Sequence, residues 1–182
     1  RKAPGTDRAP LREQQRELHR RDGTAAERDG GRRSNSGINR QSGHSNYLQA
    51  GHPELSVTGV PRFSKVFARG VYPGIDLLYH GDRDHLEYDF VVAPGADPGR
   101  IRLGFEGVAG MSVDAAGDLH LRLAEGELVQ PAPVLYQEIA GERRPVAGSF
   151  ALDSDQVGFR VAEYDRTQPL VIDPQILWSR LL

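Results

Sequence analysis

Apolar and polar residues alternate with a period of two along most of the chain after residue 45. This alternation constrains the fold more than any other feature of the sequence. In the stretch LEYDFVV (86–92), the apolar residues would lie on one face of a strand, with Glu87 and Asp89 on the other. The same alternation recurs in three further stretches: 101–105, 119–123 and 157–161. A period of two predicts β-strands with one buried face and one solvated face, so we expect Glu87 and Asp89 to be solvated.

Closely spaced turn signals separate these strands. Less regular strand candidates occupy 62–68, 75–80, 127–130, 133–139, 148–153 and 169–173. Between them lie Gly-, Pro- and Asp-rich segments such as VYPGID (71–76) and DAAGD (114–118), in which Gly74 and Gly117 can reverse the chain. Short alternating strands joined by polar turns predict an all-β, antiparallel β-sandwich-like domain.

Residues 1–45 differ in composition from the rest of the chain. They carry 11 Lys+Arg and 6 Asp+Glu, a net charge of +5, against 12 and 19, a net charge of −7, in residues 46–182. Few of them are large aliphatics, so we expect 1–45 to be a disordered Arg/Gly-rich tail ahead of a domain at 46–178. A nucleic-acid-binding arm is the alternative, but six acids dilute the basic charge and no aromatic residue lies among the basic ones. We therefore expect no nucleic-acid partner.

The sequence contains no motif that predicts catalysis, a cofactor or a metal. The chain has no cysteine, and it lacks the HEXXH, GXSXG and phosphate-loop patterns. An oxygen-rich cation site could be drawn from Asp82 and Asp84, but a polar hairpin loop explains those residues equally well. We expect no enzyme activity, catalytic residues, cofactor or metal. No apolar run approaches the roughly 20 residues that span a bilayer, so we also expect no transmembrane segment.

Paired carboxylates leave one alternative open. Glu87 and Asp89 would be about 7 Å apart on one strand face, a spacing compatible with a carbohydrate-binding or carbohydrate-active domain. Any alternating acidic strand would meet this test, so its specificity is low. Asp97 precedes a proline in a turn, and Asp165 and Arg166 lie in another turn, where a structural role is the more common one.

Several motifs, in order, resemble one known family. They are SNYLQAG (45–51), RGVYPGIDLLYHG (69–81), LEYDFVVAPGADPGRIRLGFEG (86–107), PVLYQEIAGERRPVAGSF (133–150) and VGFRVAEYDRTQPLVIDP (157–174). Together they are similar to the domain of unknown function that precedes SBBP-type β-propeller repeats in bacterial surface or secreted proteins. The resemblance covers residues 45 to about 178.

The resemblance implies a setting but no chemistry. It implies an extracytoplasmic structural or adhesion module at the cell surface or in a secreted protein, followed by propeller-type repeats of the same polypeptide, with a cell-surface or glycan partner. Residues 179–182, at the end of ILWSRLL (176–182), would then be the truncated start of the repeat region. Residues 1–44 lack the apolar pattern that the family shows there. We therefore expect strands to be missing at that edge of the fold.

Overall fold

The fold is all-β, as the alternation predicts. A computed structural model describes residues 35–81 and 86–174. Its strands, all paired antiparallel, are β1 (Asn35–Tyr47), β2 (Val57–Tyr72), β3 (Ile75–Gly81), β4 (Leu86–Val92), β5 (Leu103–Gly104), β6 (Gly110–Val113), β7 (Leu119–Leu123), β8 (Gly126–Gln130), β9 (Val134–Ile139), β10 (Glu142–Val146), β11 (Gly148–Asp153), β12 (Gln156–Val161) and β13 (Leu170–Asp173). Two single-turn 3₁₀ helices, η1 (Pro53–Leu55) and η2 (Pro98–Arg100), lie between strands.

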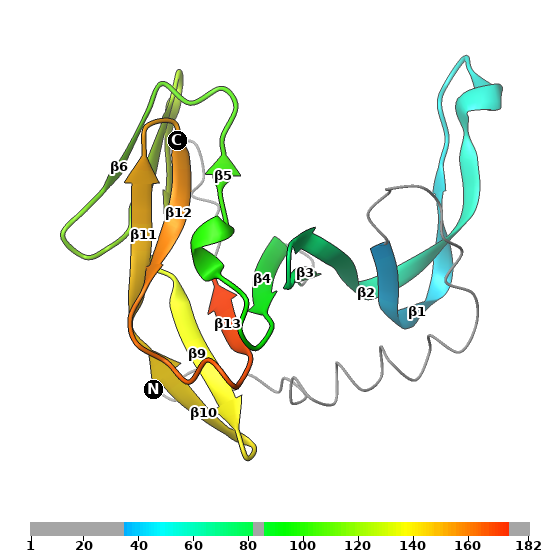
Figure 1. Cartoon of the computed structure of the whole chain (residues 1–182). Helices are drawn as coiled ribbons and strands as arrows, with labels where there is room; N and C mark the ends of the chain where they lie inside the picture. Colours follow the sequence, from blue (N-terminus) through cyan, green and yellow to red (C-terminus); the bar gives the residue numbers. More distant parts are fainter. Residues whose placement is uncertain (1–34, 82–85, 175–182) are drawn as a thin grey trace, which may run out of the picture.

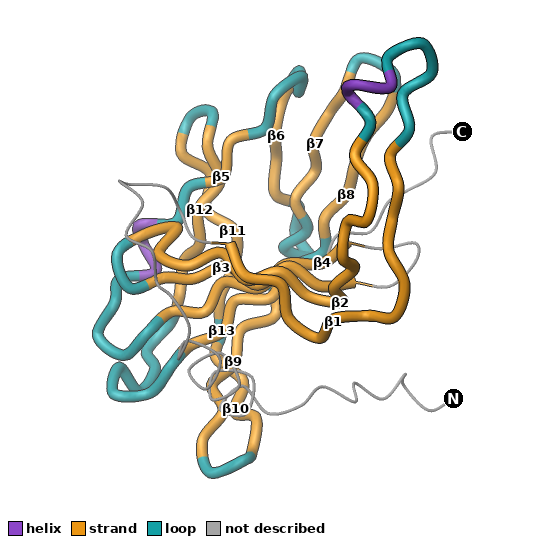
Figure 2. Tube along the Cα trace, turned by 90° about the vertical axis from the view of Figure 1, so that its right-hand side faces the viewer, coloured by secondary structure: helices purple, strands orange, loops and turns teal. Residues whose placement is uncertain are grey.

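The described strands form three sheets. The large sheet has seven strands in the order β1-β2-β3-β4-β13-β9-β10, and two sheets of three strands have the orders β11-β12-β5 and β6-β7-β8. The two small sheets lie beside the end of the large sheet that contains β4, β13 and β9 (Figures 1 and 2), and Figure 1 shows β1 and β2 extending away from them. The domain is therefore sandwich-like at one end only.

The main core lies between the large sheet and the two small sheets. One face of β3, β4, β13 and β9 packs against β7, β11 and β12. Alternate residues of β4 point into this core, as predicted from their spacing. The buried members are Ile75, Phe90, Val92, Ile101, Leu119, Leu121, Leu135, Phe150, Val157, Phe159, Leu170 and Ile172.

The predicted strands are found, with changes in extent. The expected strand 101–105 is shortened to the two residues of β5, and 62–68 lies inside the sixteen-residue β2. Strands β6 and β10 were not predicted from the sequence. β6 follows a glycine-rich loop, and β10 (ERRPV) contains a proline and three charged residues at the sheet edge, so neither has a regular apolar alternation.

The predicted start of the domain requires a correction. Residues 35–45 belong to β1, so they are part of the folded domain and not of a disordered tail. β1 also supplies a strand where the sequence suggested that one is missing. Only Ile38 of this strand is buried, because β1 is held by its antiparallel ladder to β2 and contributes little apolar surface. An apolar pattern therefore could not reveal it. The structure does not describe residues 1–34.

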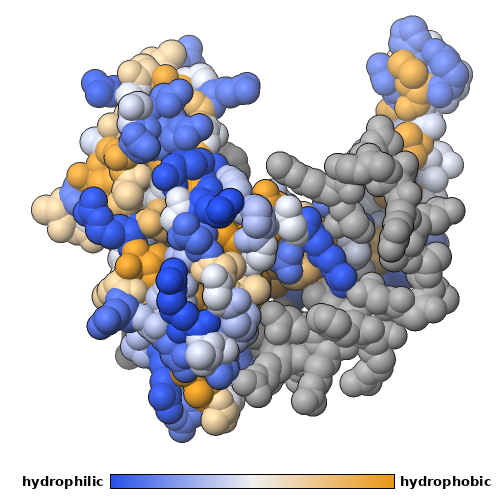
Figure 3. Space-filling model, in the orientation of Figure 1, coloured by the Kyte–Doolittle hydropathy of each residue, from blue (hydrophilic) through white to orange (hydrophobic). Residues whose placement is uncertain are grey.

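Strands β1 and β2 form a hairpin that extends beyond the sheet. β3 pairs with β2 from Lys65 onward, so residues 39–64, which we call the arm, have only each other as strand partners among the described residues. The arm projects away from the body of the domain (Figure 1), and hydrophobic atoms are exposed at its far end (Figure 3). The rest of the described chain is called the body below.

Candidate functional site

The acidic strand β4 is not the solvated feature that its alternation predicts. Asp89 is only 4% exposed, and one of its carboxylate oxygens lies 3.0 Å from Nε2 of His80 on β3. Glu87, which is half-buried, lies 3.2 Å from Nδ1 of the same imidazole. His80 pairs with Glu87 in the strand register and is therefore held between two carboxylates. The prediction of solvated acids is wrong for Asp89, which is buried with Val91 on the second face of β4, whereas the Glu87 side chain stays 32% exposed.

The cation site drawn from Asp82 and Asp84 lies outside the described residues. Within 35–81 and 86–174, no group of three or more His, Asp or Glu side chains is arranged to hold a metal ion. Among the same residues, no helix has the length and hydropathy needed to cross a bilayer.

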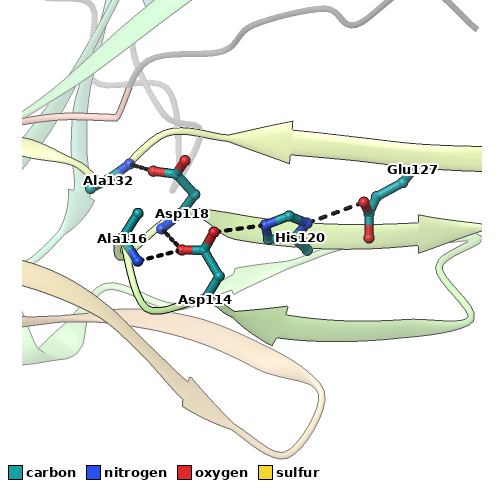
Figure 4. A network of polar contacts seen from close by, with 6 residues as sticks. All are labelled: Asp114, Ala116, Asp118, His120, Glu127 and Ala132. Carbon is teal, nitrogen blue, oxygen red and sulfur yellow. Dashed lines mark hydrogen bonds and ion pairs between the residues drawn. The ribbon is translucent and has the colours of Figure 1, made fainter.

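A second histidine is also held between two carboxylates, in the small sheet β6-β7-β8. His120 on β7 has Nε2 3.3 Å from Asp114 and Nδ1 3.1 Å from Glu127 on β8 (Figure 4). The contacts with Glu127 and then Asp114 raise the pKa of His120 above its ordinary value of 6.5. Asp114 also accepts backbone N–H bonds from Asp118 and Ala116, which lower the pKa of Asp114 below 3.8. The network fixes the β6–β7 turn and joins it to β8.

This network predicts a pH dependence of stability with a defined sign. Because folding raises the pKa of His120, its contribution is complete below pH 6.5 and is lost as the pH rises through the raised value. Because folding lowers the pKa of Asp114, its contribution is present above pH 3.8 and is lost in stronger acid. The difference in unfolding free energy between the wild type and His120→Gln should therefore be largest near pH 5 and shrink by pH 9. Urea unfolding at several pH values measures it, and a difference that grows with alkaline pH would contradict this assignment.

The predicted structural role of the 163–174 segment agrees with its contacts. The Asp165 carboxylate accepts hydrogen bonds from the hydroxyl and the backbone N–H of Thr167, at 2.7 and 2.9 Å, which lower the pKa of Asp165. Gln137 on β9, only 3% exposed, donates to the Asp165 carbonyl and accepts from the Asp165 N–H. Gln137 thus anchors the turn that precedes β13. A lone glutamine in a strand gives no sequence signal of this role.

A pocket of about 430 Å³ lies beside this turn. It is lined by the η2 segment and the end of β12, and it includes Asp97, Glu163, Tyr164 and Arg166. Asp97 also caps η2 by accepting a hydrogen bond from the Gly99 N–H at 2.9 Å, which agrees with its predicted role in a turn. Neither Glu87 nor Asp89 lines this pocket.

The tip of the arm is the third candidate surface. Tyr47, Leu48, Leu55 and Val57, which we call the apolar tip, are 64, 76, 57 and 54% exposed. With Phe63 they make up five of the eight exposed large hydrophobic residues found in the part of the chain that the structure describes. Such a concentration on one projection is typical of a contact surface.

Local hydrogen bonds hold the tip in a defined shape. The Asn46 side chain accepts from the Gly59 N–H at 2.9 Å, and the Ser56 hydroxyl accepts from the Gln49 N–H at 3.0 Å. These bonds give the SNYLQAG motif a structural role. Apolar side chains presented on an ordered loop lose less conformational entropy on binding than side chains on a mobile one.

Comparison with known proteins finds one family. The sequence profile of the family described as Domain of unknown function (DUF7948) matches residues 12–175. No curated protein and no solved structure matches the chain. The resemblance to a domain of unknown function is thus confirmed, whereas its association with propeller repeats stays a prediction. Because the profile covers most of the sequence, the chain belongs to the DUF7948 family.

Proposed function

We propose that the chain is a non-catalytic structural or adhesion module of a bacterial extracytoplasmic protein, normally placed ahead of β-propeller-type repeats. Its contact surface is the arm. The motifs between residues 45 and 178 support the setting, because they resemble the domain that precedes such repeats. The partner is another protein or a cell-surface component that the arm reaches.

The exposed apolar tip is the observation that carries this proposal. Two residues at the end of the arm, Tyr47 and Leu48, are more exposed than any other large hydrophobic residue in the described ranges. Leaving such side chains in water forgoes about 1.5–3 kcal/mol of burial per residue, which contact with a partner would recover. Tyrosine is also enriched at the energetic centres of interfaces.

The acids that suggested chemistry have structural contacts instead. Both Asp89 and Glu87, the pair considered for a carbohydrate site, contact His80. Carboxylates engaged in this way support a structural role better than a reactive one.

A double substitution at the tip tests the proposal. Tyr47→Ser/Leu48→Ser should leave the unfolding free energy within about 0.5 kcal/mol of wild type, because both side chains are exposed. When the same variant is produced in the native host, it should no longer be retained in the cell-envelope fraction or in the complex that contains the full-length protein. It should be recovered in the soluble wash fraction instead. Fractionation with quantitative immunoblotting measures this.

Val134→Ser is the matched control. Val134 is 47% exposed on β9, outside the arm, so its replacement should change neither stability nor retention. Full retention of the tip variant would contradict the proposal. Recovery of the wild type in the cytoplasmic fraction would contradict the extracytoplasmic setting.

Carbohydrate binding is the second candidate function. Its candidate site is the pocket beside η2, and not the acidic strand β4 that the sequence suggests. Burial of Asp89 and its contact with His80 weigh against a sugar site on β4. The pocket beside η2 favours this candidate, since it places the half-buried Tyr164 near the carboxylates of Asp97 and Glu163. Chemical-shift changes confined to that pocket on titration with cell-wall oligosaccharides would support sugar binding, and their absence at millimolar sugar would reject it.

A further inference from the structure

We propose that residues 12–34 of this chain dock on the face of the large sheet that is turned away from the main core, and that their arginines supply positive charge to two carboxylates buried there. The inference concerns the body, so it does not depend on the function proposed for the arm.

Both faces of the large sheet contain buried side chains. The residues that this sheet contributes to the main core lie on its first face, where the two small sheets pack: Ile75, Phe90, Val92, Leu135, Leu170 and Ile172. On the opposite face, which we call the second face, seven side chains are at most 6% exposed and none belongs to the main core: Phe67, Leu78, Asp89, Val91, Tyr136, Val171 and Asp173. Something other than the small sheets therefore covers the second face.

Side chains of the same sheet account for part of this burial. Arg69 lies over the ring of Phe67, 6.0 Å from its centroid, and Arg143 lies 4.5 Å from the centroid of the Tyr136 ring. Strands β4 and β13 are different, because two short valines that pair with each other there, Val91 and Val171, are almost completely buried. Short side chains in the middle of a sheet become buried when another layer packs on them. We infer that this layer comes from residues outside the described ranges.

Two buried carboxylates are neighbours on the second face. Ile172 of β13 pairs with Phe90 of β4, so Asp173, which follows Ile172, lies beside Asp89, which precedes Phe90. Among the described residues, these two are the charged side chains classed as buried. Like charges at neighbouring positions of adjacent strands destabilise a sheet, and buried charges are stabilised by opposite ones. A layer on this face is therefore expected to be basic.

The basic side chains of the second face lie mostly toward its margins. His80 on β3 contacts Asp89 and also Glu87, so one imidazole serves two carboxylates. The other basic residues of this face in the described body are Lys65 and Arg69 on β2 and Arg143 on β10. β2 lies two strands from β4, and β10 lies two strands from β13, a separation of about 10 Å across the sheet. The centre of the face thus attracts further positive charge.

Residues 12–34 fit this requirement better than the other segments outside the described ranges. They carry seven arginines and five acids, a net charge of +2, whereas 175–182 carry one arginine. The family profile covers 12–175, so it includes all of the first segment and one residue of the second. The four residues 82–85 span at most about 14 Å, less than the roughly 19 Å from β2 to β9.

The segment also reaches the sheet at a suitable place. It ends one residue before Asn35, where β1 begins. Ser36 pairs with Phe67, Phe67 with Leu78, and Leu78 with Asp89, so one row of residues leads from the start of β1 to the buried acids. The 23 residues reach about 75 Å when extended and about 35 Å as a helix, enough to cross the face in either form.

Paramagnetic broadening of methyl NMR signals tests the proposal on the full chain. The sequence has no cysteine, so Ala25→Cys accepts a single nitroxide label within the segment. The methyl signals of Val91 and Val171 should be broadened strongly. Those of Val92 and Leu170, their sequence neighbours on the first face, should be broadened weakly and serve as internal controls.

A charge variant tests the role of the arginines. Replacing all seven arginines of 12–34 with glutamine in the labelled chain should abolish the difference in broadening between the two faces. Lys2→Gln/Arg8→Gln is the matched control, because it removes two basic residues that precede the family profile. The difference between the faces should persist in that control.

Three outcomes would overturn the proposal. Equal or absent broadening on both faces with the label at Ala25→Cys would show that 12–34 do not dock there. Broadening of Val91 and Val171 by a label at Ser179→Cys, and not by the first label, would assign the layer to 175–182. A difference that survives loss of the seven arginines would show that the buried acids do not hold the segment. In each case the envelope-retention experiment on the arm could still succeed.

Discussion

Gly74→Val should lower the unfolding free energy by about 3 kcal/mol and the melting temperature by roughly 10 °C. Gly74 lies in the turn between β2 and β3 with φ at +71°, a conformation that β-branched residues adopt at a cost. A Cβ atom there would also lie 2.8 Å from the Cβ of Ala96. The Gly74 carbonyl accepts a hydrogen bond from the Ala93 N–H, so the turn cannot shift without disturbing the end of β4. Thermal and urea unfolding of the purified chain measure the loss.

Gly70→Val separates backbone strain from the clash. Gly70 has φ at +60°, but a Cβ added there meets nothing within 4 Å. Its replacement should cost about 1–2 kcal/mol, the strain alone. Equal losses for the two variants would show that contact with Ala96 contributes nothing, and an unchanged melting temperature for Gly74→Val would show that this turn does not control the register of β2 and β3.

Asp89→Ala should destabilise the domain by roughly 1–3 kcal/mol, the usual cost of leaving a buried polar group without its partner. Asp89 lies in the large sheet with its carboxylate 3.0 Å from the imidazole of His80, whose side chain is itself only 10% exposed. Without the carboxylate, a buried polar ring loses an acceptor that water cannot easily replace. Chemical denaturation gives the free energy directly.

Glu87→Ala is the matched control on the same strand face. The Glu87 carboxylate contacts the other nitrogen of His80, but its side chain is 32% exposed, so its loss should cost about 1 kcal/mol or less. A domain that tolerates Asp89→Ala as well as Glu87→Ala would contradict a structural role for the buried acid.

The alternation of apolar and polar residues predicts the strands because each strand packs one of its faces into the main core. Phe90 and Val92 point into that core, as their spacing requires. The spacing of the apolar residues does not show whether the opposite face of a strand is solvated or buried. β4 lies in the middle of a seven-stranded sheet, and Val91 and Asp89 on its second face are both at most 4% exposed. Whether an acid on a strand is solvated depends on the sheet order, which a local pattern does not encode.

The arm was hidden from the sequence for a different reason. A β-hairpin held mainly by backbone pairing needs few apolar residues, and β1 buries only Ile38. The SNYLQAG motif coincides with the tip, because Asn46 and Gln49 of the motif make the hydrogen bonds that organise it. The motif itself gave no sign that Tyr47 and Leu48 are exposed. A low apolar content predicts disorder, whereas at residues 35–45 it belongs to a strand that pairs with β2 and buries one side chain.

Hydrogen exchange measured by mass spectrometry tests most directly whether this domain works through its arm. The full chain would be compared free in dilute solution and bound to the cell envelope or its parent complex. We predict that exchange slows in peptides spanning residues 47–57 on binding, while peptides spanning 86–92 exchange equally in both states. Slower exchange at 86–92 with none at 47–57 would contradict the account, because the contact would then lie on the acidic strand and not on the arm.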